Sequence, residues 1–206
     1  LRNSPCCTLI NNTSSAVDGF FIETSDNFTM RCNIAAARGY GFDIEFSNNG
    51  IIENNRVLGD DATGFRLWHS NRVTLRRNTA SHAETGFVLD GSDHCELAEN
   101  IANFNERYGI GLLDFTNNNT VYLNQIGGNE ESNGYDEGGN NRWDNGTYGN
   151  FWGDYFGNGS YLVPGSARNV DNHPLILDLF PPQIDHPADL EYPLGTTGYN
   201  ITWHPI

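Results

Sequence analysis

Lysine is absent from this sequence, so all eleven basic residues are arginine. With 26 acidic residues, the formal net charge is -15. A protein that binds nucleic acid or anionic lipid needs a basic face that neutralises phosphate groups. The charge balance therefore argues against both classes of partner, and it leaves solvation or cation binding as the roles of the acidic side chains.

Long hydrophobic runs are also missing from the chain. No segment approaches the roughly 18 apolar residues of a membrane-spanning helix. The N-terminus has neither an initiator methionine nor a signal peptide. We therefore expect the sequence to be a processed or excised part of a longer chain.

The chain repeats itself with a period of about 22 residues. One landmark of the repeat is a serine at a polar corner, found at Ser4, Ser25, Ser47, Ser70 and Ser92. A second landmark is a glycine that precedes an alternating apolar segment, found at Gly19, Gly41, Gly64, Gly86 and Gly109. Two landmarks with one period indicate a solenoid of stacked repeats.

The period and the alternation together predict the fold class. Helical repeats need about 33 residues or more, and no segment here has the i, i+3, i+4 stripe of an amphipathic helix. Alternation with a period of two over four to six residues is typical of short strands. We therefore predict an all-β, right-handed parallel β-helix with three short strands and three corners in each coil.

Equal positions of successive coils should stack as columns. The interior columns are predicted to contain Phe20, Phe42, Phe65, Phe87 and Ile110, then Ile22, Ile44, Leu67, Leu89 and Leu112, then Leu9, Met30, Ile52, Leu75 and Leu97. A corner column contains Asn12, Asn33, Asn55, Asn78 and Asn100, whose amides can hydrogen-bond from coil to coil.

The four cysteines form no disulfide framework in this arrangement. Cys7 and Cys95 share an inward column, but four coils of ~4.8 Å place them about 19 Å apart, beyond the ~7 Å limit for bridged Cα atoms. Cys32 has no aligned partner, and the adjacent pair Cys6 and Cys7 is too local for an ordinary bridge. We expect no disulfide among the four residues.

The repeat resembles the parallel β-helix repeats shared by polysaccharide lyases, epimerases, surface adhesins and the NosD family. The segments NRWDNGTYGNFWGDY (141–155) and VPGSARNVDNHPL (163–175) look like the C-terminal end of NosD-type β-helices. The resemblance implies a role in copper delivery. Such a role needs thiolate, thioether or imidazole ligands, whereas Met30 points inward and the six histidines show no clustered spacing.

Three regions follow from these patterns. Residues 1–126 are predicted to be β-helix coils, and residues 127–180 an irregular polar insertion followed by a NosD-type last coil with an aromatic cap. Residues 181–206 read as a linker and the first strands of an incomplete immunoglobulin-like domain. The N-terminal coil has no cap, so self-association through it is a further expectation.

One outward face combines groups that suit a sugar. Glu45 and Asp90 lie in one outward column with Trp68 between them, about 9.6 Å apart at ~4.8 Å per coil. Arg66 and Asp43 occupy the neighbouring column. An aromatic platform, a guanidinium for a uronate carboxylate and two carboxyls make these five residues the candidate carbohydrate site. Glu45, Asp90 and Arg66 are the catalytic candidates if the protein is an enzyme.

The same columns also have a purely structural interpretation. Outward positions of a solenoid are polar because they face water, and Asp43 beside Arg66 is an ordinary cross-strand ion pair. A second charged column, Arg31, Glu53 and Arg76, alternates in sign and stabilises the register.

The corner loops before the glycines offer a weaker metal hypothesis. Asp60 and His82 align in adjacent coils, with Asp61, Glu84 and Glu106 nearby. Carboxylates suit a hard divalent cation and imidazole a softer one. Acidic loops are also common for solvation alone, so no cofactor is required by the sequence.

Asparagine-linked glycosylation is the remaining signal. Seven Asn-x-Ser/Thr sequons occur, at Asn11, Asn12, Asn27, Asn118, Asn145, Asn158 and Asn200. They favour an extracellular or cell-surface protein.

Three functional hypotheses remain open at this point. The leading one is a secreted or cell-surface module, part of a longer chain, with a structural, adhesive or glycan-binding role and with glycans or surface proteins as partners. The first alternative is a polysaccharide-active hydrolase, lyase or epimerase on the outer face, and the second is a NosD-like copper-handling accessory protein.

Overall fold

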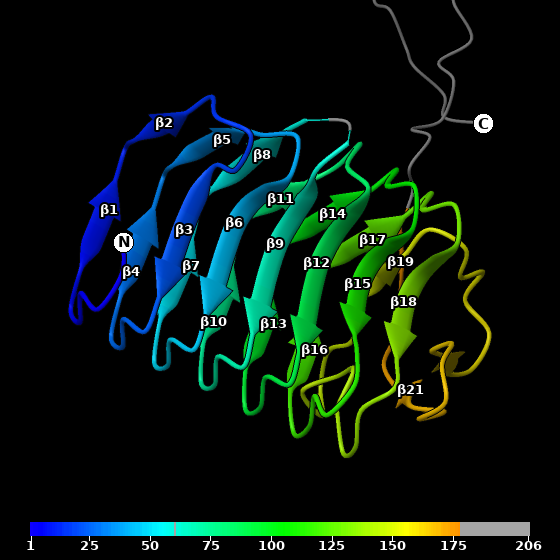
Figure 1. Cartoon of the computed structure of the whole chain (residues 1–206). Helices are drawn as coiled ribbons and strands as arrows, with labels where there is room; N and C mark the ends of the chain where they lie inside the picture. The colour runs from blue at the N-terminus through cyan, green and yellow to red at the C-terminus, as the bar shows by residue number, and fades with distance from the viewer. Residues whose placement is uncertain (60, 178–206) are drawn as a thin grey trace, which may run out of the picture.

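The computed structural model describes residues 1–59 and 61–177, which form one solenoid of parallel strands (Figure 1). The predicted immunoglobulin-like segment 181–206, the metal candidate Asp60 and the sequon at Asn200 lie outside the described residues. Within the described ranges no helix has the length and hydrophobicity needed to cross a membrane.

Each coil contributes one strand to each of three parallel sheets. The first sheet contains β1 (Thr8–Ile10), β4 (Thr29–Arg31), β7 (Ile51–Glu53), β10 (Thr74–Arg76), β13 (Glu96–Ala98) and β16 (Thr120–Tyr122). The second contains β2 (Thr13–Ser14), β5 (Ile34–Ala36), β8 (Arg56–Leu58), β11 (Thr79–Ala80), β14 (Ile101–Asn103), β17 (Gln125–Gly127), β19 (Phe151–Trp152) and β22 (Leu175–Ile176). The third contains β3 (Phe20–Glu23), β6 (Tyr40–Glu45), β9 (Thr63–Trp68), β12 (Thr85–Asp90), β15 (Tyr108–Leu112) and β18 (Ser132–Asp136).

A small antiparallel pair, β20 (Tyr161–Leu162) and β21 (Val170–Asp171), lies in the chain between β19 and β22. The register of the three sheets joins equal repeat positions, for example Phe42 to Phe65 and Leu75 to Leu97. The structure therefore confirms the parallel β-solenoid, while its right-handedness stays a prediction.

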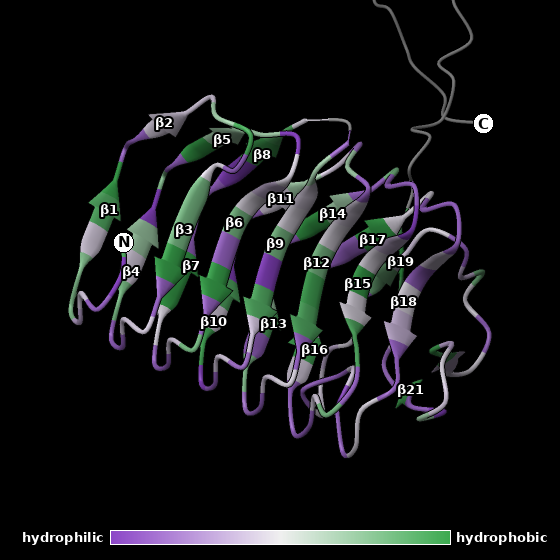
Figure 2. Ribbon diagram, viewed as in Figure 1, coloured by the Kyte–Doolittle hydropathy of each residue, from purple (hydrophilic) through white to green (hydrophobic). Residues whose placement is uncertain are grey.

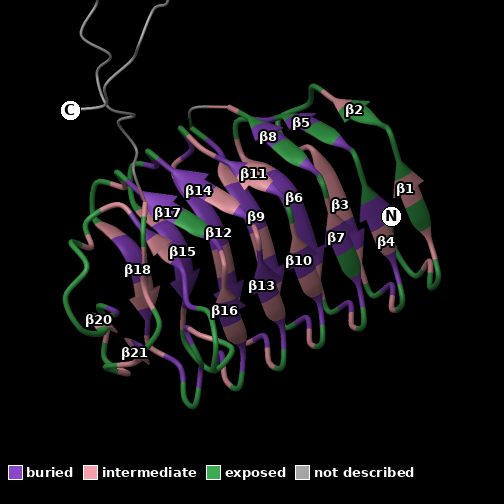
Figure 3. Ribbon diagram, turned by 180° about the vertical axis from the view of Figure 1, so that it is seen from behind, coloured by how far each residue is buried: buried purple, intermediate pink, exposed green. Residues whose placement is uncertain are grey.

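The interior is built from stacked identical side chains. The rings of Phe20, Phe42, Phe65 and Phe87 stack in sequence with centroid distances of 5.0, 4.7 and 4.8 Å. Hydrophobic residues lie on the strands and hydrophilic ones mainly in the corners (Figure 2). Burial is greatest in the middle coils, whereas β1 and β2 at the N-terminal end contain no buried residue (Figure 3). Each coil therefore buries its apolar face only against its neighbours.

Buried asparagines hold one corner of the solenoid together. In the series Asn12, Asn33, Asn55, Asn78, Asn100, Asn124 and Asn150, the backbone N–H of each asparagine donates to the Oδ1 atom of the next one, at 2.9 to 3.1 Å. Asn150 in turn donates its backbone N–H to the carboxylate of Asp171 at 2.7 Å. The predicted amide ladder is confirmed, and a buried carboxylate ends it.

The segment 127–140 corrects the sequence interpretation, which expected an irregular insertion there. β18 (Ser132–Asp136) pairs in parallel with β15, so the third sheet continues for another coil. Its interior is filled from the coil that follows, because a Cβ atom on Gly134 would meet the rings of Trp152 and Trp143. The apolar alternation of the sequence stops near residue 126, but the strands of the solenoid continue.

The aromatic residues between 143 and 156, which were expected to cap the last coil, differ in burial. Trp143 and Trp152 are fully buried in the core, and their indole N–H groups donate to the carboxylates of Asp136 and Asp171 at 2.7 and 2.8 Å. Tyr148 and Phe156 of the same cluster are 51% and 86% exposed. The two tryptophans are therefore core residues of the last coils.

All four cysteines have free thiols. Cys95 is buried in the column that contains Phe28 and Val73, and Phe28 fills the space above Gly50. Burial of Cys95 raises the pKa of its thiol to about 12. This thiol behaves as a small apolar core group.

Candidate functional site

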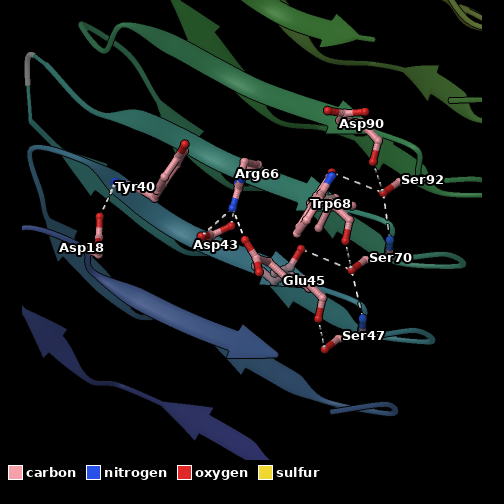
Figure 4. A network of polar contacts seen from close by, with 12 residues as sticks. Asp18, Tyr40, Asp43, Glu45, Ser47, Arg66, Trp68, Ser70, Asp90 and Ser92 are labelled. Atoms are coloured by element: carbon pink, nitrogen blue, oxygen red, sulfur yellow. Dashed lines mark hydrogen bonds and ion pairs between the residues drawn. The ribbon is translucent and has the colours of Figure 1, made fainter. Parts of the chain in front are cut away.

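The candidate sugar site lies on the outer face of the third sheet. Strand pairing places Glu45 next to Trp68, and Trp68 next to Asp90, as the repeat predicts (Figure 4). It also places Asp43 next to Arg66. Serine hydroxyls at the adjoining corner accept backbone N–H groups of the preceding coil at 2.9 to 3.0 Å and so fix the strand ends.

Arg66 is the centre of the polar contacts. Its Nε and Nη2 atoms donate to the two oxygens of Asp43 at 2.7 and 3.0 Å, and Nη2 also pairs with Glu45. Asp43 was expected to be exposed, but it is only 5% exposed because the guanidinium lies against its carboxylate. Burial opposes the charge on Arg66, yet the hydrogen bonds to Asp43 outweigh it and raise the pKa of Arg66.

Two aromatic rings bracket the same guanidinium. The Arg66 Cζ atom lies 4.4 Å from the ring centroid of Tyr40 and 5.6 Å from that of Trp68. The Nε and Nη2 donors are used by the two carboxylates, whereas within the described part of the chain Nη1 makes no hydrogen bond. A ligand carboxylate would therefore meet an arginine that is already paired, with one nitrogen left to donate.

Trp68 belongs to an aromatic group that the sequence interpretation did not find. Phe46 lies 4.8 Å from Trp68 and stacks on His69 at 5.5 Å, measured between ring centroids. Phe46 is 45% exposed, and His69 is exposed as well. A Cβ atom on Gly91 would meet the His69 ring, so the glycine of the next coil makes room for it. We call Phe46, Trp68 and His69 the aromatic group.

The only sequence signal for this group is the position of two of its members. Phe46 and His69 are the residues that directly follow Glu45 and Trp68 in adjacent coils. Both have positive φ, 47° and 48°, so the chain turns away from the sheet at that point. Bulky residues are uncommon in this conformation. Their side chains could therefore not be assigned to a face from the strand alternation alone.

The two catalytic candidates differ in their surroundings. Glu45 is paired with Arg66, while Asp90 forms no ion pair with any described residue. One strand, β9, lies between them, so their backbones are two strand spacings apart, about 9.6 Å at ~4.8 Å per spacing, with Trp68 in the intervening position. This backbone spacing is close to the ~6.5–9.5 Å that separates the two carboxyl groups of inverting glycosidases.

The metal candidates do not converge into a site among residues 1–59 and 61–177. No group of three or more His, Cys, Asp or Glu side chains there has the spacing of a metal site. Asp61, His82 and Glu106 are exposed, and Glu84 is half-buried. The His82 ring stacks on Phe104 at 5.4 Å.

The sequon asparagines that the structure describes are accessible. All six are exposed: Asn11, Asn12, Asn27, Asn118, Asn145 and Asn158. Exposure is required for modification, but whether any of them carries a glycan stays a prediction.

Comparison with known proteins adds a family. A family model described as "Periplasmic copper-binding protein (NosD)" matches residues 1–157. A search of curated proteins finds no significant match. Among solved structures, trypsin-treated QnrB1, a plasmid-mediated fluoroquinolone resistance protein, is 12% identical over 60% of this chain and 83% of that one, with a TM-score of 0.18. That likeness is too low to carry any argument.

Proposed function

This chain belongs to the NosD family of periplasmic accessory proteins, whose place is outside the cytoplasm, and we propose that it is a non-catalytic module that binds a glycan. The binding surface is the outer face of β6, β9 and β12 around Trp68. The observation that carries the proposal is the aromatic group, which is accessible and stands beside carboxylates and a guanidinium.

The chemistry of this surface matches a sugar ring. A pyranose presents apolar C–H bonds on one face, which pack on an aromatic ring, and hydroxyls around its edge, which donate to carboxylates. Trp68 supplies such a ring, and Asp90 supplies a carboxylate without an ion-pair partner among the described residues. Strands held on both sides by neighbouring coils keep these groups in fixed positions, which lowers the entropy lost on binding.

The enzyme alternative is less well supported. An inverting hydrolase needs two carboxyl groups that are free to act as acid and base. Glu45 is instead engaged by Arg66, which also holds Asp43. Arg66 itself stays charged, so it does not serve as a general base.

The family description raises copper, but the described residues do not fit a copper site. Copper sites use clustered imidazole, thiolate or thioether ligands. Met30 is fully buried in the core, and Cys95 is buried in its own column. Among residues 1–59 and 61–177, no three or more His, Cys, Asp or Glu side chains are grouped so that they could hold a metal ion. Copper therefore has no part in the proposed function.

An oligosaccharide-binding experiment tests the proposal. The full chain is screened against immobilised uronate and neutral oligosaccharides, and the affinity for the best ligand is measured by calorimetry. Trp68→Ala should weaken binding about tenfold or more, which corresponds to ~1.4 kcal/mol of lost aromatic contact. Phe156→Ala removes an equally apolar but unrelated ring, 86% exposed, and should bind like the wild type.

The result also separates binding from catalysis. Wild-type affinity in Trp68→Ala would refute the site. Release of reducing ends or unsaturated uronates by the wild type, abolished in Asp90→Asn, would favour the enzyme instead. Binding without turnover supports the module as proposed.

A further inference from the structure

A second polar pocket lies at the other end of the chain, on a different part of the solenoid. It has a volume of about 360 Å³ and is lined by two segments, 141–144 and 168–172. Arg142 forms a parallel bridge with Thr120, so this side of the pocket continues the first sheet beyond β16. The aromatic group, in contrast, lies beside the third sheet. The pocket is therefore separate from the proposed glycan surface.

Two arginines are the cationic groups of this pocket. Arg142 and Arg168 both line it and are exposed. Within residues 1–59 and 61–177 neither has a carboxylate partner, whereas six other arginines do: Arg2, Arg31, Arg66, Arg76, Arg77 and Arg107. In a chain of net charge -15, two such guanidiniums on one pocket form a local binding point for an anion.

The residues next to both arginines are held by one buried residue. Asp136 is fully buried and accepts the indole N–H of Trp143, the residue after Arg142, at 2.7 Å. Asp136 also holds the segment around Arg168, because Asn169 Nδ2 donates to the same carboxylate oxygen, Oδ2, at 2.8 Å and the Ala167 N–H donates to the Asp136 carbonyl at 3.1 Å. The two guanidiniums therefore project from anchored positions, which favours a pre-formed site.

The same two segments also supply hydrogen-bond acceptors to the pocket. The Asp144 carboxylate accepts N–H groups of Asn172 and Gly146 at 3.1 and 2.8 Å and pairs with His173 at 3.4 Å. Burial opposes its charge, but these hydrogen bonds outweigh it and lower the pKa of Asp144, so it is ionised at neutral pH. The Asn172 Nδ2 group donates to Asp144 at 3.1 Å, and the Asn172 Oδ1 atom is left as an acceptor.

This mixture of groups specifies the ligand class. A guanidinium binds a carboxylate through two parallel hydrogen bonds, and this pocket has two guanidiniums. Asp144 repels a doubly charged anion such as phosphate, but it accepts hydrogen bonds from hydroxyls. We infer that the pocket binds a sugar acid, with its carboxylate on Arg142 and Arg168 and its hydroxyls on Asp144 and Asn172. The volume lies at the lower end of the range for small-molecule sites and suits a monosaccharide.

The test is a titration of the full chain with galacturonate, followed by calorimetry or chemical-shift changes. Galactose and inorganic phosphate are the comparison ligands, and each should bind at least about tenfold more weakly than galacturonate. Arg142→Gln and Arg168→Gln should each weaken galacturonate binding by a similar factor. Arg72→Gln is the matched control, because Arg72 is also exposed and has a positive φ of 55°, close to the 52° of Arg168.

Several outcomes would overturn the inference. Equal affinity for galactose and galacturonate would show that the carboxylate is not recognised, and tighter binding of phosphate would make this a plain anion site. An equal loss in Arg72→Gln would indicate non-specific attraction, and unchanged binding in both pocket variants would exclude the pocket. Far-UV circular dichroism and the urea midpoint establish that each variant is folded.

The proposed glycan surface is tested separately by the same ligand. Trp68→Ala should bind galacturonate like the wild type, because Trp68 does not line the pocket. If Trp68→Ala loses galacturonate while the arginine variants keep it, the sugar acid binds at the aromatic group and the pocket assignment is wrong. Failure of the pocket therefore leaves the glycan surface intact, and the reverse also holds.

Discussion

Replacing Asn78 by alanine should destabilise the whole solenoid, because this side chain bonds to the backbone of the preceding coil and to Asn100 of the following one. Its Oδ1 atom accepts the backbone N–H of Asn55 at 2.9 Å, and its Nδ2 group donates to the carbonyl of Ile52 at 2.8 Å. Asn78 is fully buried, so water does not replace these partners. The alanine variant leaves the Asn55 N–H without an acceptor inside the protein.

The size of the effect follows from these contacts. A stranded buried donor costs about 1–3 kcal/mol, and the lost bond to Ile52 adds about 1 kcal/mol. We therefore expect a loss of about 2–4 kcal/mol in the free energy of unfolding. Asn78 lies in a middle coil, so the chain does not escape the cost by fraying at one end.

Equilibrium urea unfolding followed by circular dichroism measures this loss. With a slope of ~2 kcal/mol/M, the midpoint should fall by about 1–2 M. The matched control is Asn12→Ala at the exposed end of the same ladder, where the backbone N–H of Asn12 keeps its bond to Asn33 and no buried donor is stranded. That variant should lose less than about 1 kcal/mol. Equal shifts in the two variants would refute the argument that burial makes the ladder stabilising.

Three further outcomes are expected. Arg66→Met leaves the buried carboxylate of Asp43 without its partner and should lower the free energy of unfolding in urea by about 3 kcal/mol. The double variant with Asp43→Asn should recover most of this loss. An unchanged midpoint in Arg66→Met would show that the pair is dispensable. Iodoacetamide at pH 8 should label the exposed thiols of the native chain but not Cys95, as read by mass spectrometry. Modification of Cys95 before the chain unfolds would contradict its burial. Hydrogen bonds from Arg76 and the neighbouring arginine lower the pKa of Glu99. The stabilisation by these bonds is therefore present above the ordinary pKa of 4.5 and is lost as the pH falls through the lowered pKa. Between pH 6 and pH 3 the urea midpoint of Glu99→Gln should fall less than that of the wild type, and an identical fall would exclude this contribution.

The coils were predictable because stacking requires the same kind of residue at the same position. Phe42 and Phe65 are paired in register as the period indicates, and Asn55 and Asn78 form the expected ladder. A slip by one residue would turn every interior side chain outward, so the period alone determines which residues face the core.

The last coil was not predictable from the same pattern. β18 has Gly134 where earlier coils have an apolar side chain, and Asp136 where they have leucine or isoleucine. The missing volume comes from Trp143 and Trp152, which follow later in the chain. The buried carboxylate is tolerated because an indole N–H donates to it. The apolar pattern of β18 itself gives no sign that side chains from a later segment fill its interior.

The candidate site was predictable only in its strand residues. The outward columns placed Trp68 and Arg66 correctly, but they did not reveal that Asp43 is covered by the guanidinium. Phe46 and His69 were missed because they lie one residue beyond the strands, where positive φ redirects the side chains. Strand alternation ends where the strand ends, so the corner residues of this surface required the structure.

Trp68 differs from these structural residues in a way that makes its proposed role testable. Its backbone carbonyl accepts the Ser70 hydroxyl at 3.1 Å and the Phe46 N–H at 3.0 Å, and both bonds remain when the side chain is removed. The indole lies on the outer surface, half-buried, and stacks on no interior column. Trp68→Ala should therefore leave the urea midpoint close to that of the wild type, unlike Asn78→Ala. A loss of glycan binding in this variant would then report a lost contact, whereas a midpoint that fell as far as in Asn78→Ala would assign Trp68 to the fold.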